Sequence, residues 1–147
     1  MTAITDTGCA RWPRDLKVFA ILTALWASAL TARMLIRDLM PYATAQLDAV
    51  IFGMRFVGHP ARLVLAVQAM IGFTIAIGIA AERRWGILIA LAFMLEVIAS
   101  DLIFMVAHMD DIAQWRDVRI SGLLGVFAVL VLLYLWIRAR DLVWREA

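Results

Sequence analysis

The pattern of apolar and polar positions along this chain consists of four long apolar stretches separated by shorter polar segments. The stretches cover about 16–36, 61–81, 86–107 and 120–137. Each is close to the roughly 20 residues that cross the hydrocarbon core of a bilayer as a helix. None alternates as a barrel strand does, and lipid offers no partners for backbone polar groups, so helices are the spanning form that remains. The pattern predicts an all-α integral membrane four-helix bundle, with 1–147 as a single membrane domain.

The segment between the first two stretches carries a shorter apolar pattern. Its apolar side chains recur at helical spacing: Leu47, Val50, Ile51, Met54 and Val57. Asp48 and Arg55 fall on the opposite side of that helix. This spacing is typical of an amphipathic helix that lies in the membrane interface. We therefore expect an interfacial helix over about 42–57, in the first outer loop, which covers one end of the bundle.

Composition supports a membrane location and excludes several other classes. The apolar residues make up 65% of the 147-residue chain and the charged residues 18%. A soluble domain is roughly 45–50% apolar, and one of this size cannot bury such an excess. Cys9 is the only cysteine, which excludes a disulfide scaffold. The net charge of +2 provides no basic patch dense enough for nucleic acid.

The distribution of basic residues orients the predicted spans. With the N-terminus inside, eight Lys and Arg residues lie on the inner side and six on the outer side, and the compact turn at Arg83 and Arg84 is the strongest signal. This favours a multi-pass protein of a bacterial inner membrane with both termini in the cytoplasm. The segment Ala27-Ser28-Ala29 resembles a signal-peptidase site. Because the apolar stretch continues through Ile36, a retained helix is the preferred interpretation.

Polar residues within the spans are the main candidates for function, because a charge at the membrane centre costs about 2.5–3.5 kcal/mol. Glu96 lies near the middle of the third stretch, and Asp101 lies at nearly the same depth as Arg33 and Gln68. We expect these four residues to form a polar cluster, with Arg33 paired to Asp101 and Glu96 at its floor. The pairing could serve only helix register, and Arg33 could instead reach the interface. An unpaired Glu96 is expected to carry a proton.

A second set of polar residues is expected at the outer rim of the bundle, above that cluster. Its members are Arg37, His59, Arg62, His108 and Asp111. A metal site from His59, His108 and Asp111 is sterically conceivable, but two histidines beside acids at an interface are more often surface residues. We therefore predict no metal and no other cofactor.

Small residues at four-residue spacing mark faces where helices approach closely. They are Gly72, Ala76 and Ala80 in the second stretch, and Ser121 and Gly125 in the fourth. The contact is either internal or with a second copy or another membrane protein. Motifs for nucleophilic, metal-dependent or nucleotide-binding enzymes are absent from the sequence.

The order of these parts is familiar from other sequences. The chain opens with RWPRDLKVF, turns between its second and third stretches at ERRWGI and ends its fourth with LYLWIRARDL. In this it resembles many small four-span proteins of bacterial inner membranes. The resemblance covers the whole chain and implies its topology, but it assigns no functional residue.

These observations leave three functional hypotheses. The first is a non-enzymatic assembly or accessory component of the membrane, supported by the small-residue faces and the lack of catalytic motifs. The second is a small carrier or channel for protons, ions or a solute that uses Glu96 and Asp101. The third is a metal, haem or quinone-linked redox protein that uses His59 and His108.

Overall fold

The computed structural model describes residues 12–39, 48–52, 54–108 and 115–144. Its helices are α1 (Arg14–Leu39), α2 (His59–Ala80), α3 (Arg84–His108) and α4 (Trp115–Trp144). All four are long and apolar enough to cross a membrane. The four apolar stretches of the sequence thus form four helices as predicted, and the chain has the build of a multi-pass membrane protein.

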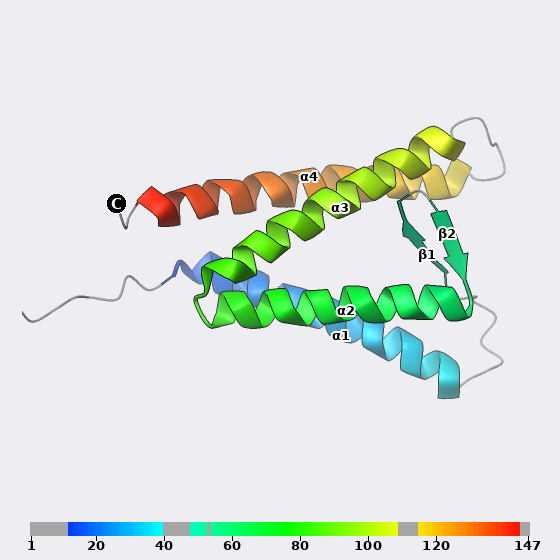
Figure 1. Cartoon of the computed structure of the whole chain (residues 1–147), viewed down its shortest axis with the longest axis horizontal. Helices are drawn as coiled ribbons and strands as arrows, with labels where there is room; N and C mark the ends of the chain where they lie inside the picture. The colour runs from blue at the N-terminus through cyan, green and yellow to red at the C-terminus, as the bar shows by residue number, and fades with distance from the viewer. Residues whose placement is uncertain (1–11, 40–47, 53, 109–114, 145–147) are drawn as a thin grey trace, which may run out of the picture.

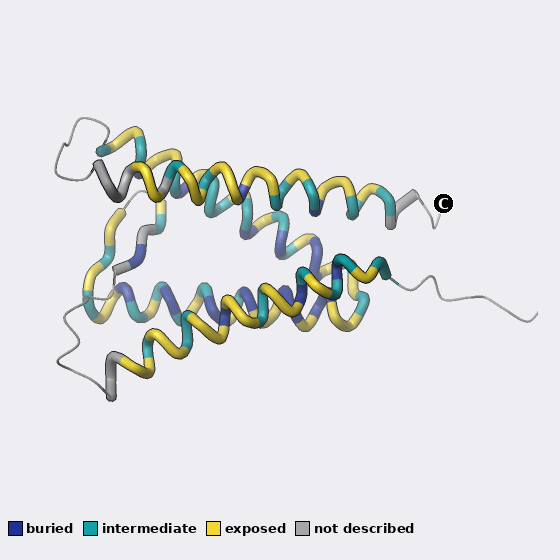
Figure 2. Tube along the Cα trace, turned by 180° about the vertical axis from the view of Figure 1, so that it is seen from behind, coloured by how far each residue is buried: buried dark blue, intermediate teal, exposed yellow. Residues whose placement is uncertain are grey.

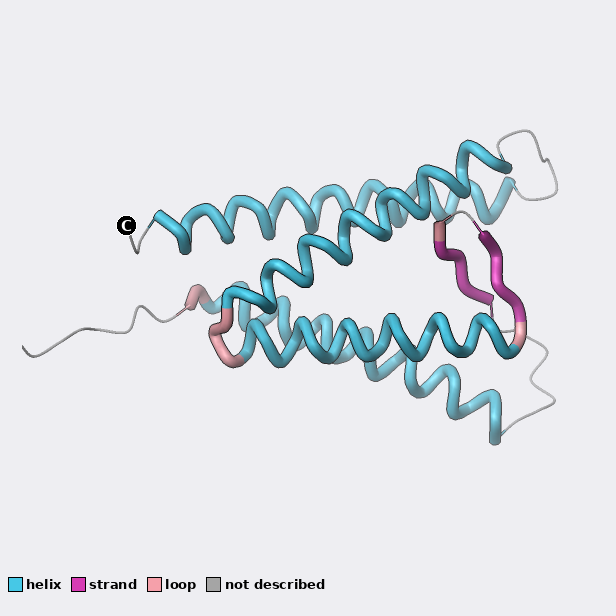
Figure 3. The backbone as a smooth tube through the Cα atoms, in the orientation of Figure 1, coloured by secondary structure: helices cyan, strands magenta, loops and turns pink. Residues whose placement is uncertain are grey.

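The helices pack as two antiparallel pairs, α1 with α2 and α3 with α4, and α2 packs against α3 to join them. The pairs converge at the end that holds the start of α1, the turn between α2 and α3, and the end of α4 (Figure 1). We call this the terminal end. The pairs diverge toward the opposite end, where two strands lie between them (Figure 3). We call that the hairpin end.

The largest core cluster lies where the pairs converge and draws on all four helices. Its buried residues are Leu16, Ala20, Ile75, Ile79, Ile87, Ala90, Phe93 and Leu135. We call this cluster the terminal-end core. The outer helices α1 and α4 are mostly exposed, whereas burial concentrates on α2 and part of α3 (Figure 2). The exposed apolar surface of α1 and α4 is what a lipid-facing helix requires.

The turn between α2 and α3 brings these two helices into their closest contact. Glu82 adopts a left-handed conformation with φ of 56°, and the Arg83 amide donates to the Gly78 carbonyl at 2.8 Å. A Cβ atom on Gly86 would lie 2.6 Å from the Gly78 carbonyl carbon, and one on Gly78 would lie 2.6 Å from the Gly86 Cα. Since real Cβ atoms do not approach backbone atoms so closely, glycine at both positions permits the contact.

The predicted interfacial helix over about 42–57 is wrong for the described part of that segment. This part forms a two-stranded antiparallel hairpin of β1 (Asp48–Ile51) and β2 (Met54–Val57), in which Ile51 pairs with Met54. Residues 42–47 lie outside the described residues.

The composition of the segment explains this outcome. A short apolar run fits a strand as well as a helix, and the β-branched and aromatic residues of the segment favour strands. The hairpin also gains tertiary packing, because Ala49 joins Ala61 and Leu65 in a second core cluster, with Phe56 packed against it.

Candidate functional site

The candidate site is a line of three polar residues on α3 that we call the polar seam: Glu96, Ser100 and Asp101. Glu96 lies at the middle of α3, twelve residues from either end, or about 18 Å at 1.5 Å per residue. Its side chain is half-buried, and its Oε1 atom is fully buried with no hydrogen-bond partner among the described residues. A carboxyl oxygen in this position has lost water without gaining a protein partner.

Ser100 lies one turn after Glu96 and is only 4% exposed. Its buried hydroxyl also makes no hydrogen bond within the part of the chain that the structure describes. The described hydroxyl groups of α1 and α2 behave differently and donate to the carbonyl four residues earlier, at 2.8–3.0 Å; these are Thr23, Ser28, Thr31 and Thr74. This local bond is the usual one for a hydroxyl in an apolar helix. Ser100 does not make it to the Glu96 carbonyl, so its hydroxyl is available to something else.

The seam faces the inside of the bundle. The Phe93 ring lies 5.8 Å from the Trp26 ring of α1, measured between centroids. Ser100 follows Phe93 by seven residues, which is two helical turns, and therefore lies on the same face of α3, toward the α1–α2 pair.

Asp101 lies beside Ser100, on the face of α3 toward α4. A Cβ atom added to Gly125 would lie 3.7 Å from the Asp101 Cβ and 3.8 Å from its Oδ2. Glycine at position 125 therefore leaves room on α4 for the Asp101 carboxyl group. The seam is thus bounded by the α1–α2 pair on one side and by α4 on the other.

The two ends of the seam have different surroundings. Toward the terminal end, the terminal-end core closes the bundle with fully buried side chains such as Leu16, Ile79 and Leu135. Toward the hairpin end, His108 is seven residues beyond Asp101. Its ring stacks on Phe104 with 4.4 Å between centroids, and its Nδ1 lies 3.0 Å from the Phe104 carbonyl oxygen. His108 therefore lies two turns beyond Asp101 toward the hairpin end, with the buried Phe104 between them.

Arg33 and Asp101 lie on helices that diverge toward the hairpin end. Arg33 is an exposed residue near the end of α1, and Asp101 packs against α4. The ends of α1 and α3 lie on opposite arms of the diverging pairs in both views (Figures 1 and 2). Gln68 is half-buried on α2. Equal depth in the membrane placed these residues at one level, but it does not fix which helices are neighbours.

The rim residues also fall on different arms. His59 is exposed at the start of α2, with Arg62 half-buried in the same turn, whereas His108 ends α3. The side chain of Arg37 and all of Asp111 lie outside the description. Within the described residues, no group of three His, Cys, Asp or Glu side chains is placed to hold a metal ion.

Two of the predicted small-residue contacts occur inside the chain. A Cβ atom on Gly72 would lie 3.0 Å from the Ala27 Cβ and from the Trp26 ring, so Gly72 packs against α1. Gly125 faces α3, as described above. Ala76 is buried, and Ala80 is exposed. The side chain of Ser121 lies outside the description.

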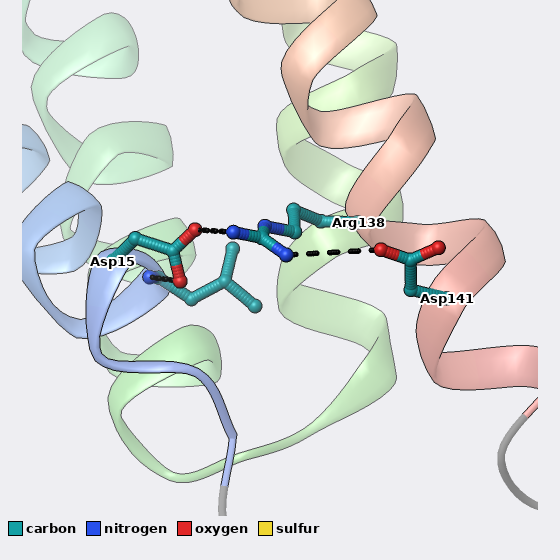
Figure 4. A network of polar contacts seen from close by, with 4 residues as sticks. Asp15, Arg138 and Asp141 are labelled. Carbon is teal, nitrogen blue, oxygen red and sulfur yellow. Dashed lines mark hydrogen bonds and ion pairs between the residues drawn. The ribbon is translucent and has the colours of Figure 1, made fainter.

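A polar network that the sequence analysis did not identify lies at the terminal end. Arg138 of α4 contacts Asp15 of α1, and its Nη1 lies 3.7 Å from the Asp141 Oδ2 (Figure 4). Lys17 Nζ lies 2.9 Å from the Glu82 Oε1. The buried Tyr134 hydroxyl lies beside Asp15 and Arg138, and the Tyr134 ring centroid is 5.8 Å from the Arg138 guanidinium carbon. The sequence contained a signal for this contact. With an even number of spans, the start of α1 and the end of α4 lie on the same side, and they carry the opposite charges of Asp15 and Arg138.

The seam has the chemistry of a site for a proton, a small cation or water. A buried carboxyl group requires a proton, a counter-ion or a hydrogen-bond donor to offset its desolvation. The Ser100 hydroxyl can both donate and accept. Two carboxyl groups one to two turns apart also disfavour simultaneous ionisation of both.

Comparison of the chain with protein-family models, with curated proteins and with solved structures gives no match.

Proposed function

We propose that this protein is a small membrane carrier that binds and releases a proton at Glu96, in the middle of the bilayer. The observation that carries the proposal is the pair of buried oxygens, Glu96 Oε1 and Ser100 Oγ, that make no hydrogen bond among the described residues. Such groups reduce stability, and an intramembrane ionisable residue without a structural partner is by default a functional candidate.

The surroundings of the seam support a direction of access. Ser100, Asp101 and then His108 follow Glu96 along α3 toward the hairpin end, while the terminal-end core closes the other side. In this conformation a proton reaches Glu96 from the hairpin end. We place the hairpin end on the outer side of a bacterial inner membrane and the terminal end in the cytoplasm, in keeping with Arg83 and Arg84 at the latter.

The assembly role expected from the sequence has less support than this proposal. The residues that favoured it include Gly72 and Gly125, which pack against α1 and α3 of the same chain. The redox role relied on His59 and His108, which lie on different arms of the bundle.

The first test detects the proton directly and requires no knowledge of a co-transported solute. Infrared difference spectra of the protein in vesicles, recorded across a pH cycle, should contain the carbonyl band of a protonated carboxylic acid. Glu96→Gln should remove this band, whereas Asp141→Asn, which neutralises an acid of the terminal-end network, should leave it unchanged. A wild-type spectrum without the band, or a band that survives Glu96→Gln, would overturn the proposal.

The second test measures transport. Vesicles that contain the protein and a pH-sensitive dye should equilibrate an imposed pH gradient faster than empty vesicles. Glu96→Gln should reduce this rate by about tenfold or more, a size typical of the loss of a proton-transfer group. Equal rates for the wild-type protein and Glu96→Gln would count against a carrier.

A further inference from the structure

An apolar groove of about 390 Å³ lies between α1 and α2, at the surface of the protein. Ala20 and Ala76 form its floor, since both are buried, while Ile21 and Ile77 form its walls and are more than half exposed. The groove exists because alanines occupy the floor, where larger side chains would fill it. In a membrane, a groove of this kind opens to the acyl chains of lipid.

The groove runs along the helices from the membrane edge inward. Lys17 lines it near the terminal end, and Ala24 lines it seven residues later on α1, about 10 Å farther in. Phe73 of α2 also lines the groove, seven residues before Ala80. The groove is therefore elongated, and its long axis is parallel to the acyl chains of the surrounding lipid.

Positive charge gathers at the terminal end of the groove. Lys17 is the only charged residue in the groove lining and the only lysine of the chain. Glu82 contacts it at 2.9 Å, and the exposed Arg83 and Arg84 follow Glu82 directly. Lys17 and Arg83 together carry two positive charges against the one negative charge of Glu82 at this end of the groove.

We propose that this groove binds one acyl chain of an anionic phospholipid, whose phosphate lies against Lys17 and Arg83. The apolar lining matches a hydrocarbon chain in shape but does not distinguish one lipid from another, because lipid tails are all apolar. The basic groups supply that distinction, since they attract anionic headgroups. Lys17 is suited to this position because its long stem lies along apolar surface while the ammonium group reaches the headgroup layer. The inference does not depend on proton carriage at Glu96.

The test measures retained lipid by native mass spectrometry. The full chain is reconstituted in vesicles of equal phosphatidylglycerol and phosphatidylethanolamine and extracted in mild detergent. The wild-type protein should retain phosphatidylglycerol preferentially, and Lys17→Gln should reduce this retention about fivefold, the effect of one basic group at an anionic surface. The matched control Arg140→Gln, an exposed basic residue at the same end of α4, should retain as much as the wild type.

Two further variants separate lipid binding from local structure. Ala24→Leu should fill the groove and reduce retention, whereas Ala99→Leu, at an exposed alanine of α3, should not. Glu82→Gln breaks the same ion pair as Lys17→Gln but should maintain or raise phosphatidylglycerol retention, because it removes a competing negative charge. Equal retention of both lipids by the wild type, or reduced retention in Glu82→Gln, would overturn the proposal.

Discussion

The polar groups at the terminal end and those of the polar seam have opposite environments. At the terminal end, Asp15 meets Arg138 and Lys17 meets Glu82, and these side chains are 32–45% exposed. In the middle of α3, Glu96 and Ser100 have buried oxygens that form no hydrogen bond with any described group. Charges are therefore paired where water already lowers their cost, and hydrogen bonds are missing where that cost is highest. Stability alone does not account for such an arrangement.

The two ends of the molecule also differ in how closely their helices pack. At the terminal end, Gly78 and Gly86 let α2 and α3 touch, and one core cluster unites four helices. At the hairpin end, the helix pairs diverge and the strands occupy the space between them. The terminal end is thus the more closely packed part of the molecule, whereas the helix pairs separate toward the hairpin end.

Substitution of Gly86 by alanine should have the largest effect on stability. The new Cβ atom would lie 2.6 Å from backbone atoms of Gly78 and Ile79, which cannot move aside as a flexible side chain does. We expect the free energy of unfolding, measured by titration with a denaturing detergent, to fall by about 2–3 kcal/mol. Gly122→Ala is the matched control, because its Cβ would meet only the flexible end of Met105 at 3.5 Å. Equal losses in both variants would refute a specially close contact at the terminal end.

Replacement of Glu96 by leucine should stabilise the protein. The change removes a buried oxygen that lacks a hydrogen bond and keeps a similar side-chain volume, so the free energy of unfolding should rise by about 1–2 kcal/mol. Asp15→Leu should act in the opposite direction, because it removes an acidic partner of Arg138. Both are measured in the same detergent titration. A loss of stability in Glu96→Leu would mean that Glu96 holds the structure together.

The ion pair of Lys17 and Glu82 should contribute least. A double-mutant cycle with Lys17→Met and Glu82→Gln should give a coupling energy below about 1 kcal/mol, because both side chains are partly exposed. The coupling should also decrease with added salt. A larger coupling that is insensitive to salt would show that the terminal end is less hydrated than its exposure indicates.

Much of the fold was predictable from the sequence, because one physical rule dominates it. A run of about 20 apolar residues becomes a spanning helix, and the four runs do so here. The spacing of apolar residues was a poorer guide over residues 48–57. Ten residues are too few to distinguish the 3.6-residue period of a helix from the two-residue period of a strand. The contacts of Ala49 and Phe56 with α2 are tertiary, so local spacing did not contain them.

The site was only partly predictable for a related reason. Charge within an apolar run identified Glu96 and Asp101 from residue type alone. Their equal predicted depth in the membrane then suggested that Arg33 pairs with Asp101, although the helices that carry these residues diverge toward the hairpin end. Ser100 stands out because its buried hydroxyl makes no hydrogen bond with a described residue, and the sequence alone does not reveal this.

The contact between Asp15 and Arg138 joins residues 123 positions apart, which determines when the terminal end can close. A ribosome that adds 5–20 residues per second needs roughly 6–25 s to synthesise the chain between them. Only in the last part of that interval, once residue 108 has been made, are α1, α2 and α3 complete without α4. At that stage the side of Asp101 that faces Gly125 is still uncovered, and α4 is the helix that covers it.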